Sequence, residues 1–339
     1  MKNLSRRKFI NQGGILATTF ALPLSFNRLL NTNVMKNKKD FDVIIIGGSY
    51  SGLAAAMALG RALRKVLIID SGKPCNRQTS HSHNFLTQDG KTPNEMATLA
   101  RQQVSKYDTV EFFNGLATNG SKIEKDFEIQ TSSGDIFMAT KLIFATGIKD
   151  LMPNTKGFSE CWGISVLHCP YCHGYEVKNE TTAILGNGEY GFEFSKLITN
   201  WTKDLTLFTN RKSTLTSQQA TILESHHIKI IEKEIEELEH INGQLQYIIF
   251  KDDSKKAFNA IYTRLSFEQH CPVPSKLGCE LTEDGYIKID SSYKTTIDGI
   301  FACGDNVSRM RTVANAISTG TTTGMILNKE LVEEKFNIN

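Results

Sequence analysis

The apolar residues of this chain predict two segments that each run strand, helix, strand. In the first segment, residues 42–46 and 65–69 are apolar runs with the length of a strand that is buried on both faces. Residues 53–63, between these runs, are rich in alanine and have a helical pattern. This order predicts a parallel βαβ unit and hence an α/β fold.

The second segment lies near the middle of the chain. Residues 182–185 and 205–208 are short strand patterns that a helical pattern separates. Residues 217–282 add a helical pattern, strands around residues 228–231 and a hairpin at Asn242-Gly243, which would complete the domain. We therefore predict two Rossmann-like dinucleotide-binding domains.

A glycine-rich turn follows the first strand of the first segment. It spans residues 47–52, and the acid Asp70 ends the next strand. Glycines let the backbone approach a pyrophosphate at a helix N-terminus, and an acid at this place can bind ribose hydroxyls. Ser49 stands where the dinucleotide pattern has its second glycine, and its small side chain keeps the approach close. The predicted site consists of Gly47, Gly48, Ser49, Gly52 and Asp70.

The second segment has the full Gly-x-Gly-x-x-Gly pattern at Gly186, Gly188 and Gly191. No acid follows the next strand to bind a ribose 2′-hydroxyl, and the sequence there contains the adjacent cations Arg211 and Lys212. Two cations favour a 2′-phosphate, so the pattern predicts a preference for NADP(H) over NAD(H). The alternative is a solvated basic loop.

The last part of the chain is predicted to return to the first domain. Further strand patterns are residues 127–131, 136–138, 141–144 and 299–305. The first two flank a turn and predict a hairpin, and the third leads into Ala145-Thr146-Gly147. The last ends on Gly304-Asp305, before a helical pattern from about Thr312 to Glu333. Ligands of α/β sheets lie at the carboxyl ends of strands, which makes Asp305 a candidate contact.

Between the two glycine patterns lies the sequence Cys169-Pro170-Tyr171-Cys172-His173. Two such cysteines can form a disulfide on the first turn of a helix, where the positive helix end stabilises a thiolate. His173 would lie near Cys169 as its i+4 neighbour and can move protons near neutral pH. We predict Cys169, Cys172 and His173 as catalytic residues. A zinc site is the alternative, but the sequence has no second ligand pair at a fixed spacing, so no metal is predicted.

Charge excludes one class of partner. Residues 1–40 hold eight of the 39 basic residues and one of the 36 acidic residues, so the rest carries a net charge of −4 although the whole chain carries +3. This is not the charge pattern of a nucleic-acid-binding protein. Seven irregularly spaced cysteines do not form the framework of a disulfide-rich secreted fold.

The first 34 residues have the features of an export signal. Ser5-Arg6-Arg7-Lys8-Phe9-Ile10 resembles the twin-arginine signal, and the apolar run from Gly13 to Leu24 is too short to span a bilayer. We therefore expect a leader at residues 1–34, export by the twin-arginine route and no stable membrane anchoring beyond the leader. The alternative is a cytoplasmic protein that starts at Met35.

The order of these motifs resembles the low-molecular-weight thioredoxin reductase family. The resemblance rests on both glycine-rich turns, Ala145-Thr146-Gly147, the Cys-x-x-Cys pair and Phe301-Ala302-Cys303-Gly304-Asp305, and it covers residues 41–335. It implies a discontinuous FAD-binding domain at residues 41–155 and 283–335, with an NAD(P)H-binding domain inserted at residues 156–282. It also implies a homodimer.

The resemblance further implies roles for particular residues. Those that would bind FAD are Gly47, Gly48, Ser49, Gly52, Asp70, Gly147, Gly304 and Asp305. Those that would bind NADPH are Gly186, Gly188, Gly191 and Arg211. Polar candidates for the flavin pocket, each also explained as an ordinary loop residue, are Arg77, His81, His83 and Asn84. Cys172 would exchange electrons with the flavin, and Cys169 would react with the sulfur of a thioredoxin-like protein or a small dithiol or disulfide.

Three departures leave the direction of the reaction open. The family has Asp after the second cysteine, whereas this chain has His173, and its Cys-Pro-Tyr-Cys-His-Gly-Tyr-Glu is closer to the gliotoxin-oxidase-like dithiol oxidases. The usual His-Arg-Arg is reduced to Thr209-Asn210-Arg211, and the usual Arg-Gln is Arg311-Thr312. We expect an FAD-dependent dithiol/disulfide oxidoreductase that reduces a disulfide with NAD(P)H. The alternatives are an oxygen-dependent dithiol oxidase and a non-catalytic nucleotide- or zinc-binding protein.

Overall fold

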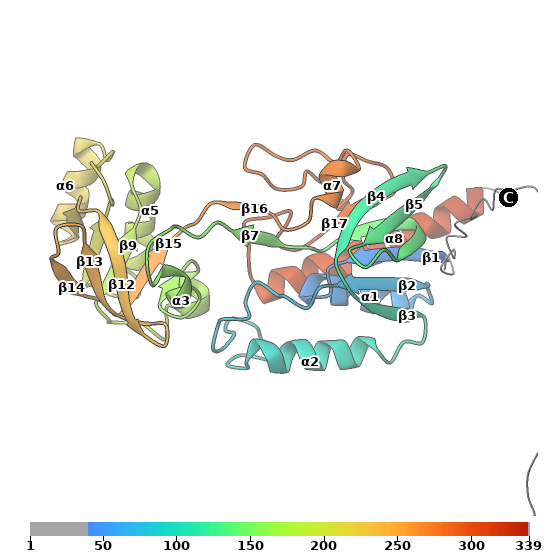
Figure 1. The fold of residues 1–339 in the computed structure, drawn as a ribbon, viewed down its shortest axis with the longest axis horizontal. Coiled ribbons are helices and arrows are strands. Elements are labelled where there is room, and N and C mark those ends of the chain that lie inside the picture. Colours follow the sequence, from blue (N-terminus) through green and yellow to red (C-terminus); the bar gives the residue numbers. More distant parts are fainter. Residues whose placement is uncertain (1–39, 338–339) are drawn as a thin grey trace, which may run out of the picture. The chain divides into compact units, whose positions relative to one another are not determined.

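A computed structural model describes residues 40–337, so the predicted leader and Met35 lie outside the described residues. One sheet has seven strands in the order β3-β2-β1-β6-β5-β4, with β17 paired to β6 (Figure 1). Its strands are β1 (Asp40–Ile46), β2 (Val66–Asp70), β3 (Val110–Asn114), β4 (Ala117–Ile123), β5 (Asp126–Thr131), β6 (Ile136–Phe144) and β17 (Ile300–Ala302). The strands around β1 pair in parallel, whereas β4 and β5 pair antiparallel. The predicted α/β fold is confirmed.

Strand β6 joins the parallel and antiparallel parts of this sheet. The sequence predicted separate strands at residues 136–138 and 141–144, but they form one continuous strand. Its first half pairs antiparallel with β5, and its second half pairs in parallel with β1. Ala139 is buried and takes part in both ladders, which explains why no break occurs between the halves.

Two helices of this first fold pack closely together. Helix α1 (Tyr50–Arg61) connects β1 to β2 as predicted, and α8 (Val313–Asn337) crosses it. Gly320 and Gly324 of α8 permit the contact, because a Cβ atom at either position would overlap backbone oxygens of α1. This packing brings the chain just before α8 beside the turn before α1. Helix α2 (Pro93–Val104) begins with a capping box formed by Thr92 and Glu95.

A second sheet has five parallel strands in the order β11-β10-β9-β15-β8. Its strands are β8 (Val166–Leu167), β9 (Thr182–Leu185), β10 (Leu205–Phe208), β11 (Lys229–Ile231) and β15 (Ala260–Thr263). The helices of this fold are α3 (Phe158–Cys161), α4 (Pro170–His173), α5 (Gly188–Ile198) and α6 (Ser217–Ser225). The hairpin predicted at Asn242-Gly243 joins β12 (Ile235–Ile241) to β13 (Gln244–Phe250), and β14 (Lys255–Ala257) extends it.

A two-stranded antiparallel ribbon connects the sheets. It consists of β7 (Ile148–Asp150), which follows the first sheet, and β16 (Phe267–Gln269), which follows the second. After β16, Cys271 and Cys279 are buried in the first core together with α7 (Val273–Lys276). Cys271 and Cys279 thus fill space in the core of the first fold. The chain therefore returns to this core before residue 283, the position at which the sequence predicted the return. Within residues 40–337, no helix is both long and apolar enough to cross a membrane.

Candidate active site

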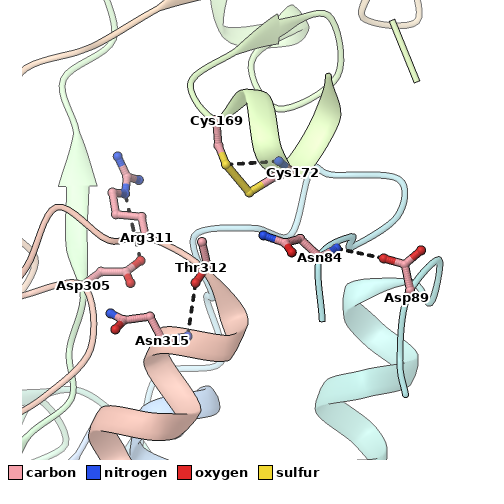
Figure 2. Close-up of a disulfide and its surroundings, with 8 residues drawn as sticks. All are labelled: Asn84, Asp89, Cys169, Cys172, Asp305, Arg311, Thr312 and Asn315. Atoms are coloured by element: carbon pink, nitrogen blue, oxygen red, sulfur yellow. Dashed lines mark hydrogen bonds and ion pairs between the residues drawn. A yellow bond between two sulfur atoms is a disulfide. The ribbon is translucent and has the colours of Figure 1, made fainter. Parts of the chain in front are cut away.

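The two cysteines of the Cys-x-x-Cys motif form a disulfide at the start of α4 (Figure 2). Their Cα atoms are 5.3 Å apart, and the Cys172 amide donates to the Cys169 sulfur at 3.2 Å. Pro170 occupies the first helical position, where no amide hydrogen is needed. The predicted disulfide on a helical turn is confirmed. Since α4 has only 4 residues, the local Cys172 amide, rather than a long helix dipole, is the group that favours a Cys169 thiolate.

Two histidines flank the disulfide. The pKa of His173 is lowered, because burial outweighs the effect of the Glu176 carboxylate, which raises the pKa, and His83 lowers the pKa further. Burial and the nearby Arg311 guanidinium lower the pKa of His168 to about 4. The His168 ring stacks on Trp162, with centroids 5.8 Å apart. His168 is therefore neutral at pH 7, whereas His173 lies between opposing influences and is the better proton carrier.

One cavity lies between the disulfide-bearing segment and the first fold. The predicted residues Ser49, Gly147 and Asp305 line it from the first fold, and His168 and His173 line it from the second. Cys75, Asn76, Gln78 and Thr79 also line it, whereas the neighbouring polar candidates Arg77, His81, His83 and Asn84 do not. The fold of the loop thus decides which of its side chains face this cavity.

An ion-pair cluster closes one side of this cavity. Arg311 donates two parallel hydrogen bonds to Asp150, at 2.8 and 2.9 Å, and both side chains are largely buried. The Arg311 Nε is 4.0 Å from Asp305 Oδ2 (Figure 2). Burial, partly offset by Arg311, raises the pKa of Asp305 to about 6. Sequence reasoning missed Asp150, because its partner is distant in the chain and nothing in the local pattern marks it.

Cys75 is a second residue that sequence reasoning missed. Its sulfur is 3.9 Å from Asp305 Oδ2. The side chain is open to solvent, but many protein atoms surround its thiol, and this desolvation together with the Asp305 carboxylate raises the pKa of Cys75 to about 11. The Cys75 thiol therefore stays protonated at neutral pH and is a poor nucleophile.

The first glycine-rich turn has the shape that a dinucleotide needs. Gly47 has φ +104°, a conformation that favours glycine, and a Cβ atom on Gly52 would overlap the Gly47 carbonyl oxygen. The Gly48 amide donates to Asp70 Oδ1 at 3.1 Å. Gly47, Gly48, Ser49 and Asp70 line a second cavity, and Ser49 makes no side-chain cap on α1. The residues present therefore fit the pyrophosphate and ribose of a dinucleotide.

The second glycine-rich turn is held differently. The Asn187 side-chain oxygen accepts the amide hydrogens of Gly188 and Thr214, both at 2.8 Å. Its amide nitrogen donates to the Lys212 carbonyl at 3.0 Å. One side chain thus ties the turn to the loop that the sequence predicted for a 2′-phosphate. Arg211 in that loop is exposed.

The ring of Tyr190 also lies against this turn. A Cβ atom on Gly186 would be 2.9 Å from ring carbons of Tyr190. The Tyr190 hydroxyl is buried and has no hydrogen-bond partner among the described residues.

In residues 40–337, no three His, Cys, Asp or Glu side chains lie close enough together to hold a metal ion.

Comparison with known proteins agrees with this geometry. The sequence profile of the family described as pyridine nucleotide-disulphide oxidoreductase matches residues 41–320. Thioredoxin reductase sirT of Leptosphaeria maculans is 30% identical over 313 residues, which cover 85% of this chain and 93% of sirT. Thioredoxin reductase tcpT of Claviceps purpurea (strain 20.1) is 29% identical over 315 residues, which cover 88% and 97%. The crystal structure of the oxidoreductase from Agrobacterium tumefaciens is 33% identical with a TM-score of 0.81, and the match covers 87% of this chain and 99% of that one.

The family match decides between the enzyme and the non-catalytic alternative that the sequence left open. It covers both glycine-rich turns and the disulfide, so no part of the candidate site falls outside it. The chain therefore belongs to the pyridine nucleotide-disulphide oxidoreductase family and is an FAD-dependent disulfide oxidoreductase that resembles thioredoxin reductases.

Proposed function

We propose that the Cys169–Cys172 pair exchanges electrons with FAD on one side and reduces a disulfide substrate on the other, with NAD(P)H as the electron source. The observation that carries this proposal is the shared cavity, which Asp305 and Ser49 line from the first fold and His173 lines beside the disulfide. A flavin bound there would act as the two-electron carrier. The residues proposed to bind it are Gly47, Gly48, Ser49, Gly52, Asp70, Gly147, Gly304 and Asp305.

The reduced pair performs two exchange steps. The Cys169 thiolate attacks one sulfur of the substrate disulfide, which forms a mixed disulfide and releases the first substrate thiolate. Cys172 then attacks the Cys169 sulfur, which restores the Cys169–Cys172 disulfide and releases the second thiolate. His173 lies next to Cys172, donates a proton to the first leaving thiolate, and then accepts the Cys172 proton and passes it to the second.

The second glycine-rich turn is the proposed nicotinamide nucleotide site. Gly186, Gly188 and Gly191 supply its Gly-x-Gly-x-x-Gly pattern, and the exposed cations Arg211 and Lys212 follow the next strand. These cations support a preference for NADPH over NADH, because a 2′-phosphate carries charge that a ribose hydroxyl lacks.

A second candidate function is an oxygen-dependent dithiol oxidase. The hydrogen bonds that Asn187 makes with Lys212 and Thr214 favour this function. Together with the bond from Gly188, they occupy backbone groups of the turn and of the basic loop that a nucleotide would need. In this reaction the same residues act in reverse: a substrate thiolate attacks the disulfide, His173 accepts a proton, and oxygen takes the electrons.

Anaerobic stopped-flow spectroscopy of the FAD-loaded protein distinguishes the two functions. The protein is mixed with NADPH, NADH or dithiothreitol, and bleaching of the flavin absorption is followed. Rapid bleaching by NADPH is the expected result for the reductase. Bleaching by dithiothreitol alone, followed by recovery when oxygen is added, would replace the reductase with the oxidase.

Exposed aromatic side chains beside the disulfide support the proposal that a partner docks there. Tyr171 is 63% exposed and Tyr175 is 70% exposed, on either side of Cys172 and His173. Exposed tyrosines are typical of binding surfaces. We propose that they contact a thioredoxin-like protein or a small dithiol or disulfide. Replacement of both by serine is expected to raise the KM for substrate without loss of flavin.

We also propose a homodimer. A cavity of about 590 Å³ lies between α1, α2 and α8, and apolar residues such as Leu53, Met57 and Leu99 line most of it. Met325 on its wall is 63% exposed, and a solvent-exposed apolar surface of this kind is typical of an interface. Light scattering is expected to give the mass of a dimer for wild type and of a monomer for Met325→Lys with Leu99→Lys. A monomeric wild type would refute this.

Export remains a proposal from the sequence, since residues 1–34 lie outside the described residues. The support is the Arg6-Arg7 pair followed by an apolar run. A reporter fused to these residues is expected to leave the cytoplasm, and replacement of both arginines by lysine is expected to retain it. A reporter that stays in the cytoplasm with both arginines present would favour a start at Met35.

A further inference from the structure

His83 lies between two carboxylates that belong to different folds. Its Nδ1 is 3.4 Å from Asp89 Oδ2, and its Nε2 is 3.5 Å from Glu176 Oε1. Asp89 belongs to the same loop of the first fold, whereas Glu176 follows α4 in the segment that bears the disulfide. The His83 ring thus lies within ion-pair distance of one carboxylate from each fold.

The first fold holds the loop of His83 in place. The Ser82 amide donates to the Lys91 carbonyl at 2.8 Å, which closes the loop beside the start of α2. Phe85 packs on the buried cluster that contains Tyr50. The Asn84 amide donates to Asp89 Oδ1 at 2.8 Å (Figure 2). Asp89 is thereby fixed by the backbone next to His83 and orients the His83 ring toward Glu176.

Glu176 also acts on the proposed proton carrier. Its carboxylate raises the pKa of His173, and the charge of His83 lowers it. The ring of His81 is 6.5 Å from that of His83. Other titratable groups also face this site: Tyr175 and Tyr262 interact with Glu176, and His168 interacts with His173. The Glu176 carboxylate therefore interacts with two histidines, His83 of the first fold and His173 of the second.

We propose that His83 is a positioning residue for thiol–disulfide exchange: held by Asp89, it holds Glu176 and so sets how strongly that carboxylate supports the acid–base work of His173. This rests on the proposed role of His173. His83 competes with His173 for the Glu176 carboxylate, whose charge raises the pKa of His173. Loss of His83 therefore leaves Glu176 to stabilise the protonated form of His173.

The test is the pH dependence of anaerobic flavin reduction by dithiothreitol in the FAD-loaded protein. In His83→Ala, the midpoint assigned to His173 is expected to move up by roughly half a pH unit or more, and in Glu176→Gln it is expected to move down. In the double variant, the midpoint is expected to differ from the sum of the two single shifts, because part of the effect of His83 passes through Glu176. An unmoved midpoint in His83→Ala, or a double variant in which the two shifts simply add, would overturn the proposal.

Two further variants keep the outcome interpretable. Asp89→Asn loosens His83 without replacing it, so a smaller upward shift is expected even where His83→Ala folds poorly. His81→Gln is the matched control, since His81 pairs with neither carboxylate in the described part of the chain, and its midpoint is expected to stay at the wild-type value. His173→Ala separates the two failures. A midpoint that persists in His173→Ala refutes the role of His173 itself, whereas a midpoint lost there but unmoved in His83→Ala refutes only the link through His83.

Discussion

The two glycine-rich turns share one order of strand, turn and helix but differ in what surrounds them. In the first turn, Gly48 donates to the acid that ends the next strand, and a cavity lies in front of the turn. In the second, Asn187 engages Gly188 and bridges to the loop after β10. The glycine pattern therefore specifies the close packing of strand and helix in both cases. It does not by itself specify an open ligand site.

The residue between the first two glycines accounts for much of this difference. In the first turn the corresponding residue, between Gly47 and Ser49, is Gly48, so no side chain at this position reaches across the turn. In the second, the residue between Gly186 and Gly188 is an asparagine, whose amide can donate and accept at once. A single polar side chain can thus convert a potential phosphate cradle into a self-satisfied loop.

The variant with the largest expected effect tests whether flavin binding by the first turn is independent of the disulfide. If the first turn binds the flavin independently of the cysteines, Cys169→Ser will keep its flavin but lose disulfide exchange completely, because the attacking sulfur is gone. Flavin absorbance gives the first quantity, and reduction of a disulfide dye gives the second. Cys161→Ala is the control, since Cys161 is a free, buried cysteine of the same fold. Wild-type turnover in Cys169→Ser would contradict the mechanism.

The second prediction compares the last glycine of each pattern. A Cβ atom on Gly52 would overlap the Gly47 carbonyl oxygen, whereas on Gly191 it would be 3.0 Å from the nearest atom of Gly186. Gly52→Ala is expected to weaken FAD binding roughly 10- to 100-fold, from an overpacking cost of ~1–3 kcal/mol. Gly191→Ala is expected to retain FAD. Titration of the apoprotein with FAD measures both, and equal losses would end the distinction between the turns.

The sequence predicted what depends on neighbouring residues. Apolar runs placed β1, β2, β9 and β10, and Pro170 placed the start of α4, because strand burial and helix capping are local properties. It could not predict the Asp150–Arg311 pair, which joins β7 to the start of α8. Such a contact exists only after the first fold has brought these two distant segments together. The self-capping role of Asn187 was visible in principle, but only the fold brings Lys212 and Thr214 within its reach.

The third prediction concerns the two sides of the active-site cavity. The pKa of His168, on the side of the second fold, falls from 6.5 to about 4, so the folded protein binds fewer protons there than the unfolded chain. Its contribution to stability is therefore present at neutral pH and is lost as the pH falls from about 6.5 to about 4. Asp305 acts oppositely, since its pKa is raised to about 6 and its contribution declines as the pH rises toward that value.

Urea unfolding of the FAD-loaded protein at pH 7 and pH 4.5 tests this difference. In His168→Gln, the loss of unfolding free energy on acidification is expected to be smaller than in wild type, by on the order of 1–2 kcal/mol. In Asp305→Asn, the loss of unfolding free energy on acidification is expected to be larger than in wild type, since this variant lacks the carboxyl group that stabilises the folded protein at low pH. Identical acid sensitivity of all three proteins would show that the cavity is more solvated than its burial suggests.

The smallest expected effect bears directly on the comparison of the turns. In Asn187→Gly, the bonds from Asn187 to Gly188, Lys212 and Thr214 are lost, and the Gly188 amide becomes available. If this tie competes with the nucleotide, NADPH will bind about fivefold more tightly, as expected for the release of ~1 kcal/mol of hydrogen bonding. Calorimetric titration with NADPH measures the change. Asn187→Asp is the control, because it keeps the oxygen that engages Gly188 and loses only the donor to Lys212. Weaker NADPH binding in Asn187→Gly would mean that Asn187 builds the nucleotide site instead of closing it, and the second turn would then work as the first does, with an ordered loop in place of an open cradle.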